Sequence, residues 1–245
     1  MRVHRPLLIC VLLALAASGL LPAAAADAEA DGFATPEAAI TEYLAGIAAL
    51  DTERIVGATS AELASTRYRF DALIDRIGAF TPISMLAPAE HPFYAEINLA
   101  RERDAALRNV LMLAYGLLSS EEIDSGVIFP VDKAWADLFA FIIDPTRLAD
   151  IELVAIKLAD EELQADSRYL ENAAKQAAGF GADELTERLA LFEFEGELFE
   201  LGFTLLRYGD DWRVMRQSSP LAGTEPIGTA RLTTLEEFES GASDS

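Results

Sequence analysis

The side chains through which this sequence could do acid–base chemistry are carboxylates. Glu193, Glu195, Glu197 and Glu200 stand around a short Glu-Gly-Glu turn that joins two runs of strand composition. Alternation along a strand places Glu193 and Glu195 on one face, opposite the phenylalanines beside them. That face either meets water or lines a cleft. In a cleft, burial would raise the pKa of a carboxyl group and allow it to act as a base on a carbon acid.

Tyr43, Tyr115 and Trp135 could donate hydrogen bonds inside such a cleft. Each of them lies on an apolar stripe at helical spacing, so packing in the core is the expectation for all three. Two acidic runs, at residues 121–124 and 160–162, are expected at solvated helix ends or in loops. The sequence therefore assigns no catalytic residue and leaves any ligand-binding residues unknown.

Most other routes to catalysis need histidine or cysteine. Beyond the N-terminal apolar run, the sequence contains His91 and no cysteine. A zinc site built on cysteine and histidine, a cysteine nucleophile and a Ser-His-acid triad therefore lack their residues or their pattern. No glycine-rich phosphate loop and no calcium-loop spacing is present. We expect His91, which precedes Pro92, to be a loop residue beside a helix start, and we expect neither a metal nor a cofactor.

The N-terminus has the pattern of a secretory signal peptide. Two arginines precede an apolar run over residues 7–21, and small residues follow as far as Ala28. We expect residues 1–26 to be the signal peptide, with cleavage after Ala26 or Ala28. An uncleaved anchor helix would need about 20 apolar residues, which is more than this run offers. The sequence therefore predicts an exported protein, periplasmic or secreted, whose mature chain contains no cysteine.

The charge balance excludes several classes of partner. The sequence has 19 basic and 41 acidic residues, a formal net charge of −22. Two of the basic residues belong to the signal peptide, so the mature chain keeps 17 against 41, or −24. Such a surface repels phosphate backbones and anionic lipid headgroups. We expect no nucleic acid and no peripheral membrane binding, which leaves a small molecule, a protein partner or a homodimer.

Apolar residues at helical spacing dominate the first part of the mature chain. They predict helices over about 36–50, 51–56, 69–79, 92–118, 132–143 and 166–178. Residues 151–158 are short, branched and apolar enough for a buried strand, although periodicity alone also permits a helix. The sequence thus predicts a helical N-terminal part with an uncertain element near residue 151.

The last third has strand composition. Three runs, over about 185–194, 198–208 and 212–217, are joined by short turns, which predicts consecutive antiparallel hairpins. We expect Phe199, Leu201, Phe203 and Leu205 to share one buried face of the middle strand. Residues 221–245 are expected to form a mobile acidic tail. Helices followed by an antiparallel meander indicate an α+β fold, in a single domain over residues 27–220.

Two stretches carry a resemblance to a known family. They are Phe33 to Ile40 with Tyr43-Leu44 and Leu50-Asp51, and Tyr208-Gly209-Asp210-Asp211-Trp212-Arg213-Val214. These stretches are similar to the opening helix and closing hairpin of the ketosteroid isomerase-like superfamily, also called the nuclear transport factor two-like or SnoaL-like superfamily. The resemblance implies N-terminal helices packed on a curved C-terminal antiparallel sheet that forms a cone with an internal pocket. It also requires a helical insertion over about 69–150.

The superfamily contains isomerases, cyclases and dehydratases as well as noncatalytic binding domains, so its fold does not choose a function. We expect an exported noncatalytic domain that binds a small apolar ligand or a protein partner, because the resemblance is combined with few catalytic side chains. The alternative is an isomerase or cyclase that uses a pocket carboxylate and a tyrosine. A purely structural envelope protein would share the sequence features of the first.

Overall fold

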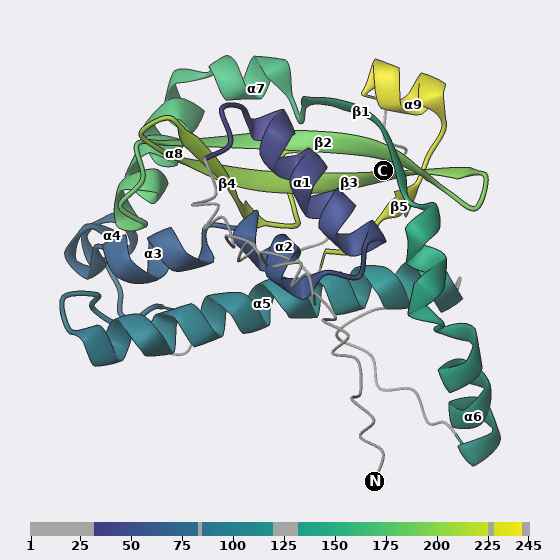
Figure 1. Cartoon of the computed structure of the whole chain (residues 1–245). Coiled ribbons are helices and arrows are strands. Elements are labelled where there is room, and N and C mark those ends of the chain that lie inside the picture. Colours follow the sequence, from purple (N-terminus) through teal and green to yellow (C-terminus); the bar gives the residue numbers. More distant parts are fainter. Residues whose placement is uncertain (1–31, 83–84, 120–131, 225–227, 242–245) are drawn as a thin grey trace, which may run out of the picture.

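The structure, a computed structural model, describes residues 32–82, 85–119, 132–224 and 228–241 (Figure 1). The expected signal peptide and the acidic run at 121–124 lie outside the described residues. No helix within the described ranges combines the length and the apolar composition that spanning a membrane requires.

An antiparallel sheet forms the centre of the fold. Its strands β1 (Glu152–Leu158), β2 (Glu184–Phe194), β3 (Glu197–Tyr208) and β4 (Asp211–Arg216) lie in that order, and β5 (Arg231–Leu232) also pairs with β3. The three predicted strands of the last third are confirmed. The turn between β2 and β3 uses Glu195 and Gly196, whose φ angles of 51° and 84° are those of a tight hairpin turn.

The first helix, α1 (Pro36–Ala48), begins as the sequence predicts. The Thr35 side chain accepts a hydrogen bond from the N–H of Ala38 at 3.1 Å, and Pro36 occupies the first turn. Asp51 caps α2 (Thr52–Gly57) in the same way. A further helix that the sequence did not predict, α3 (Ala61–Arg67), follows directly.

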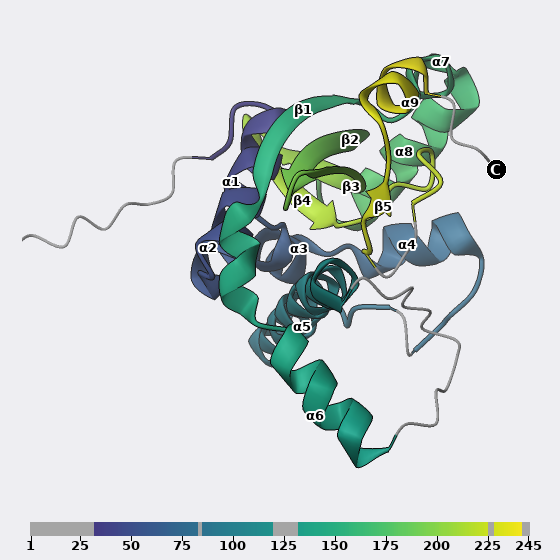
Figure 2. The same cartoon turned by 90° about the vertical axis from the view of Figure 1, so that its right-hand side faces the viewer.

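The concave face of the sheet packs on α1 and α5 (Pro92–Ser119) and forms the main core (Figure 2). The expected alternation on β3 is confirmed, because Leu201, Phe203 and Leu205 are fully buried in this core and Phe199 packs against it. Tyr43 of α1 lies among them. Aromatic and branched side chains therefore fill the space inside the cone.

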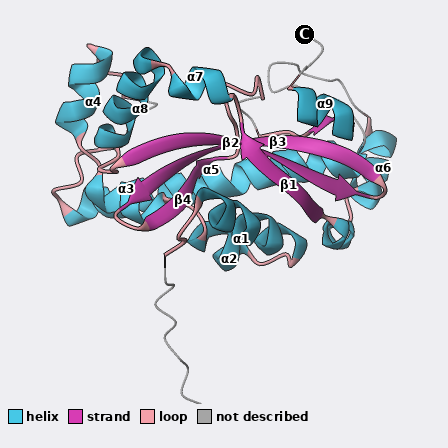
Figure 3. Cartoon of the chain, turned by 90° about the horizontal axis from the view of Figure 1, so that it is seen from above, coloured by secondary structure: helices cyan, strands magenta, loops and turns pink. Residues whose placement is uncertain are grey.

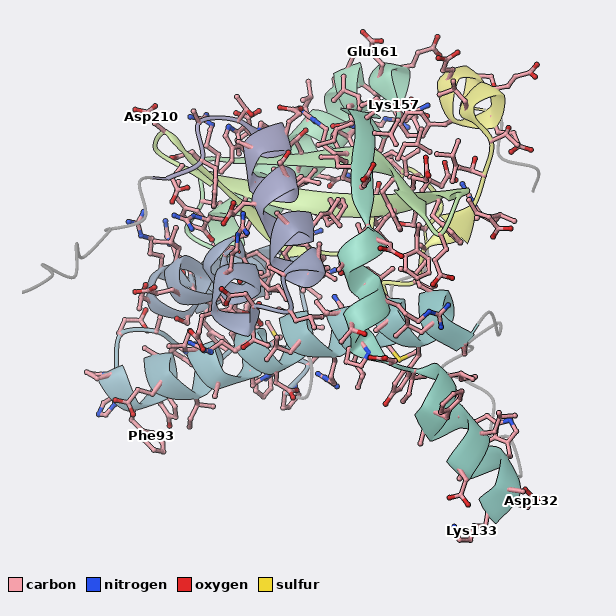
Figure 4. The ribbon with its side chains drawn as sticks, turned by 45° about the vertical axis from the view of Figure 1, so that its right-hand side comes forward. Phe93, Asp132, Lys133, Lys157, Glu161 and Asp210 are labelled. Carbon is pink, nitrogen blue, oxygen red and sulfur yellow. The ribbon has the colours of Figure 1, made fainter. Side chains whose placement is uncertain are left out.

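The described residues between 69 and 150 are mainly helical. They include α4 (Phe70–Ile77), α5, α6 (Lys133–Ile142) and the 3-10 helix η1 (Pro145–Asp150). Helix α5 runs beneath the sheet, with Phe93 at one end, whereas α6 projects away from the body and carries Lys133 at its tip (Figure 4).

The convex face of the sheet is covered by α8 (Ser167–Gly179) and α9 (Leu235–Ser240), while the short helix α7 (Glu161–Ala165) precedes α8 (Figure 3). The expectation of a mobile tail over 221–245 is wrong for residues 228–241. Phe238 of α9 is 4% exposed and packs against Leu189 and Leu191. This one buried aromatic ring anchors an otherwise acidic helix.

The element near residue 151 is a strand rather than a helix. It lies at the edge of the sheet and pairs with β2 alone, so it is half-exposed instead of buried. Val154 is one of its exposed apolar side chains. An edge position explains the difference, because a neighbouring strand covers only one side of β1.

Candidate ligand-binding site

The carboxylates around the β2–β3 turn do not line the cone. Glu193 and Glu197 are exposed to solvent. Glu195 forms a two-point ion pair with Arg147, with both N···O distances at 2.7 Å. Hydrogen bonding from the Arg147 guanidinium holds the pKa of Glu195 below its usual range. These three side chains are solvated, which is the first of the two readings that the sequence allowed.

Glu200 is the exception, because it is only 5% exposed. It lies on the convex face and forms an ion pair with Arg231 of β5, whose Nε donates to its Oε1 at 2.6 Å. A cavity of about 340 Å³ opens beside it, under α9. Lys157, which also lines that cavity, donates to the backbone oxygen of Phe238. The charged groups here already have partners within the protein.

The three aromatic candidates differ in how deeply they are buried. Tyr43 is core, as expected: its hydroxyl donates to Oε1 of Gln217 at 2.9 Å, and its ring packs edge-on against Phe203. Tyr115 is half-buried and packs against Phe139 of α6. Core packing is wrong for Trp135, which is 42% exposed on the projecting helix α6, where no described residue is buried.

The histidine and the second acidic run lie where the sequence predicted. His91 is exposed directly before α5, and its Nδ1 accepts a hydrogen bond from the N–H of Phe93 at 3.2 Å. Asp160 caps α7 by accepting from the N–H of Leu163 at 2.8 Å, and Glu161 and Glu162 are exposed in the first turn. None of these residues forms part of a site.

A pocket of about 410 Å³ lies between α3, α4, α5 and the end of β4. Its apolar wall comes from all four elements and from the loops between them, and its polar side chains come from α4, α5, α8, β4 and the loops. The residues that line it include Tyr68, Arg76, Met85, Leu86, Arg101, Glu102, Ala105, Ala106, Met215 and Arg216.

Helix α5 holds the loop that closes one side of this pocket. The buried Asn98 amide donates to the carbonyl oxygen of Ala87 and accepts from its N–H, both at 2.8 Å. One turn further, Arg101 donates from Nη1 to the carbonyl oxygen of Met85 at 2.7 Å. These bonds fix the Met85–Ala87 backbone, so that Met85 and Leu86 form a defined pocket wall.

Glu102 is the carboxyl group of the pocket. Within the described ranges, no hydrogen bond or ion pair satisfies its side chain. Burial raises its pKa, and the positive charges of Arg216 and Arg101 oppose that rise in part. A partly buried carboxyl group without a protein partner is a common feature of binding and catalytic sites.

Tyr68 lies in the same pocket wall and is 3% exposed. Its ring packs edge-on against Phe180, with the ring centroids 5.8 Å apart. The hydroxyl lies near the Leu86 backbone, yet it makes no hydrogen bond of acceptable geometry to a described residue. Burial raises the pKa of this hydroxyl. An unpaired buried hydroxyl is unfavourable by about 1–3 kcal/mol, so it is a group that a ligand or water would stabilise.

Sequence reasoning missed this site, although α5 carries a signal for it. Asn98, Glu102, Ala105 and Asn109 recur at spacings of three and four, so polar and small residues share one face of the helix.

Sequence reasoning also missed Glu187, a buried carboxylate beneath α8. Its oxygens accept from the Ser219 hydroxyl, the Leu221 N–H and the Tyr169 hydroxyl at 2.6, 3.0 and 3.2 Å, so it is satisfied by the protein itself.

No group of three or more histidine, cysteine, aspartate or glutamate side chains in the described part of the chain is placed to hold a metal ion. A scan against protein-family models finds no match, and a search of the curated proteins finds none either. The SnoaL-like resemblance of the sequence therefore has no family model behind it.

A search of solved structures finds a cystatin-like protein from Ruminococcus gnavus ATCC 29149. The TM-score is 0.55 and the sequence identity 14%, and the match covers 82% of this chain and 45% of the other. This chain thus spans less than half the length of that protein. The cystatin-like fold is related to the nuclear transport factor two-like fold, and identity this low shows the fold alone. The chain accordingly shares with that protein an α+β architecture of helices packed on a curved antiparallel sheet.

Proposed function

We propose that this protein is an exported, noncatalytic domain that binds a small molecule with an apolar body in the pocket between α3, α4, α5 and β4. The observation that carries the proposal is the pair of unpartnered polar groups, Tyr68 and Glu102, in a pocket of about 410 Å³. This volume lies within the usual range for small-molecule sites. The interior of the cone offers no such site near Tyr43, where the core is filled.

The composition of the pocket wall supports binding rather than catalysis. The described residues that line it include no histidine, cysteine or lysine, and Glu102 is the one carboxyl group among them. Apolar contacts from Met85, Leu86 and Met215 would supply most of the affinity, and the few polar groups would fix the orientation of the ligand.

A second candidate function has a specific observation in its favour. Glu102 and Tyr68 are a carboxyl group and a tyrosine in one pocket, which is the combination that an isomerase or cyclase would need. The raised pKa of Glu102 suits a general base. In this reading Glu102 would move the proton and Tyr68 would donate a hydrogen bond to the developing oxyanion.

Binding is tested with 1-anilinonaphthalene-8-sulfonate, a fluorescent probe with an apolar body and one anionic group. We expect saturable binding to the wild-type protein and a loss of at least about tenfold in affinity for Ala106→Trp, because the indole would occupy the pocket. Ala174→Trp, on the exposed face of α8, is the matched control and should keep the wild-type affinity. Equal affinity in all three proteins would refute the proposed site.

Catalysis is tested with a β,γ-unsaturated ketone, whose isomerisation produces a conjugated chromophore. The binding function predicts no turnover above the buffer rate. Turnover by the wild-type protein that Glu102→Gln abolishes, with the fold and the fluorescent-probe affinity intact, would reject the noncatalytic function and establish the second candidate.

A further inference from the structure

The pocket has a charge opposite to that of the molecule around it. Four charged side chains line it: Arg76, Arg101, Arg216 and Glu102. Three positive charges against one negative give a formal charge of +2, in a chain whose net charge is −22. A concave site lined by one sign of charge concentrates ligands of the opposite sign. The pocket is therefore a local attractor for anions on a surface that otherwise repels them.

Arg216 is the arginine with the most freedom to meet a ligand. It stands at the end of β4, is exposed, and forms no ion pair or hydrogen bond in the part of the chain that the structure describes. Arg76, by contrast, donates to the Gln176 side chain at 3.3 Å, and Arg101 donates to the Met85 carbonyl oxygen. The charge of Arg216 acts on Glu102 in the same pocket, yet its N–H groups make no hydrogen bond to a described residue and can offer a carboxylate two parallel hydrogen bonds.

An apolar groove of about 340 Å³ adjoins the pocket. It is lined by Phe70, Phe80, Pro82, Met85, Leu86, Ala87, Pro88, Tyr94, Ile97, Asn98 and Arg101. Among the described residues that line it, Arg101 alone is charged. Phe80 is 62% exposed and Ile97 is 41% exposed, so the groove presents apolar side chains to solvent. Met85, Leu86 and Arg101 belong to both the pocket and the groove.

We infer that the ligand is a single-chain anionic amphiphile, such as an alkyl carboxylate, whose anionic group binds at Arg101 and Arg216 and whose chain extends into the groove beside Ile97. This inference rests on the proposed binding function and specifies its ligand class. Arg101 stands where the two compartments meet, so a molecule with one charged end and one apolar end matches both of them at once. A neutral apolar molecule would not compensate the positive charge of the three arginines, and a cation would be repelled by it.

The test compares three amphiphiles with the same chain: dodecanoate, 1-dodecanol and dodecyltrimethylammonium. Each displaces the bound fluorescent probe from the full-length protein, at concentrations below those at which micelles form. We expect dodecanoate to bind at least about tenfold more tightly than the other two, because charge-assisted hydrogen bonds discriminate to this extent. From hexanoate to dodecanoate, affinity should rise roughly fourfold per methylene as apolar surface is buried.

Two variants test where the anionic end and the apolar end of the ligand bind. Arg216→Gln should remove most of the preference for dodecanoate over dodecanol, and Arg168→Gln, an exposed arginine of α8, is the matched control that should keep it. Ile97→Asp should weaken dodecanoate more than hexanoate, because a charge enters the groove at a side chain that is already 41% exposed.

The outcomes separate the two proposals. If dodecanol and dodecanoate displace the probe equally well and Arg216→Gln changes the affinity for neither of them, the anionic ligand class is refuted. The proposed binding pocket is not refuted by that result. If none of the three amphiphiles displaces the probe and Ala106→Trp binds it like wild type, the pocket itself is refuted and this inference falls with it.

Discussion

Asn98 of α5 forms two hydrogen bonds of 2.8 Å with the backbone of Ala87, donating to the carbonyl oxygen and accepting from the N–H. One side chain thereby satisfies both polar groups of a residue in the pocket loop. Asn98→Ala would leave two backbone groups without these partners, and we expect a loss of about 2–4 kcal/mol in the free energy of unfolding. Denaturant unfolding measures this loss, and amide exchange at residues 85–89 should accelerate.

Asn172→Ala is the control for that variant, because Asn172 is exposed on α8. Its unfolding free energy should stay within about 0.5 kcal/mol of wild type. Equal stability of the two variants would show that Asn98 does not hold the loop.

The raised pKa of Glu102 gives a prediction with a definite sign. A group whose pKa is higher in the folded state contributes stability below its unfolded pKa of about 4.3, and that contribution is lost as the pH rises through the folded value. Glu102→Gln keeps the side chain neutral at every pH. The variant should therefore be more stable than wild type at about pH 8 and equal to it at about pH 4.

Denaturant unfolding at the two pH values measures this difference. Ala95→Gly, in the first turn of the same helix as Glu102, is the control without a titratable group, and its difference from wild type should be the same at both pH values. A Glu102→Gln variant that is less stable than wild type at about pH 8 would mean that the ionised carboxylate is favoured in the folded protein.

The guanidinium of Arg147, a residue of η1, contacts the β2–β3 turn, α5 and α6. It pairs with Glu195 at 2.7 Å and donates from Nη1 to the carbonyl oxygens of Leu118 and Ile142, at 3.1 and 3.0 Å. Lysine cannot reproduce this geometry. We expect Arg147→Lys to cost about 1–3 kcal/mol in unfolding free energy, because two carbonyl oxygens lose their donor.

Arg54→Lys is the comparison, since Arg54 makes only the exposed pair with Glu42 among the described residues. Arg54→Lys should lower the unfolding free energy less than Arg147→Lys does, because an exposed ion pair contributes little. If thermal and denaturant unfolding show equal losses of stability for the two variants, the hydrogen bonds from Arg147 to the carbonyl oxygens do not stabilise the fold.

Phe238 decides whether the C-terminal segment belongs to the folded domain. Its ring packs on Leu189 and Leu191, and the Lys157 ammonium lies 4.5 Å from the ring centre. Phe238→Ala should cost about 3 kcal/mol, and limited proteolysis should then cut the chain beyond residue 228. Phe141→Ala, at a side chain that is 80% exposed, should change stability by less than about 0.5 kcal/mol. Equal losses of stability in the two variants would show that residues 228–241 are not held on the folded domain by Phe238.

The sequence allowed the sheet and the first helix to be predicted because local signals specify them. Pro36 after Thr35 opens α1, and the Glu195-Gly196 turn joins two strands of alternating residues. The C-terminal helix was missed because one buried ring, Phe238, anchors a segment that is otherwise acidic. Periodicity cannot reveal a contact with strands far away along the chain.

The pocket could not be predicted for the same reason. Tyr68, Glu102 and Arg216 belong to a loop, a helix and a strand that are distant in sequence, and each residue taken alone is ordinary. The carboxylates that alternation singled out, Glu193 and Glu195, lie at an exposed hairpin end. Local pattern thus located the strands, whereas the site depends on how α5 crosses beneath α3 and β4.

The position of the bound ligand shows whether the pocket between α3, α4, α5 and β4 is the binding site, and the methionines report that position. The sequence contains Met1, Met85, Met112 and Met215, of which Met85 and Met215 line the pocket and Met112 does not. With ¹³C-methyl methionine, addition of 1-anilinonaphthalene-8-sulfonate should shift the NMR signals of Met85 and Met215 and leave that of Met112 in place. Saturable binding with the Met85 and Met215 signals unmoved would place the ligand elsewhere and refute the proposed pocket.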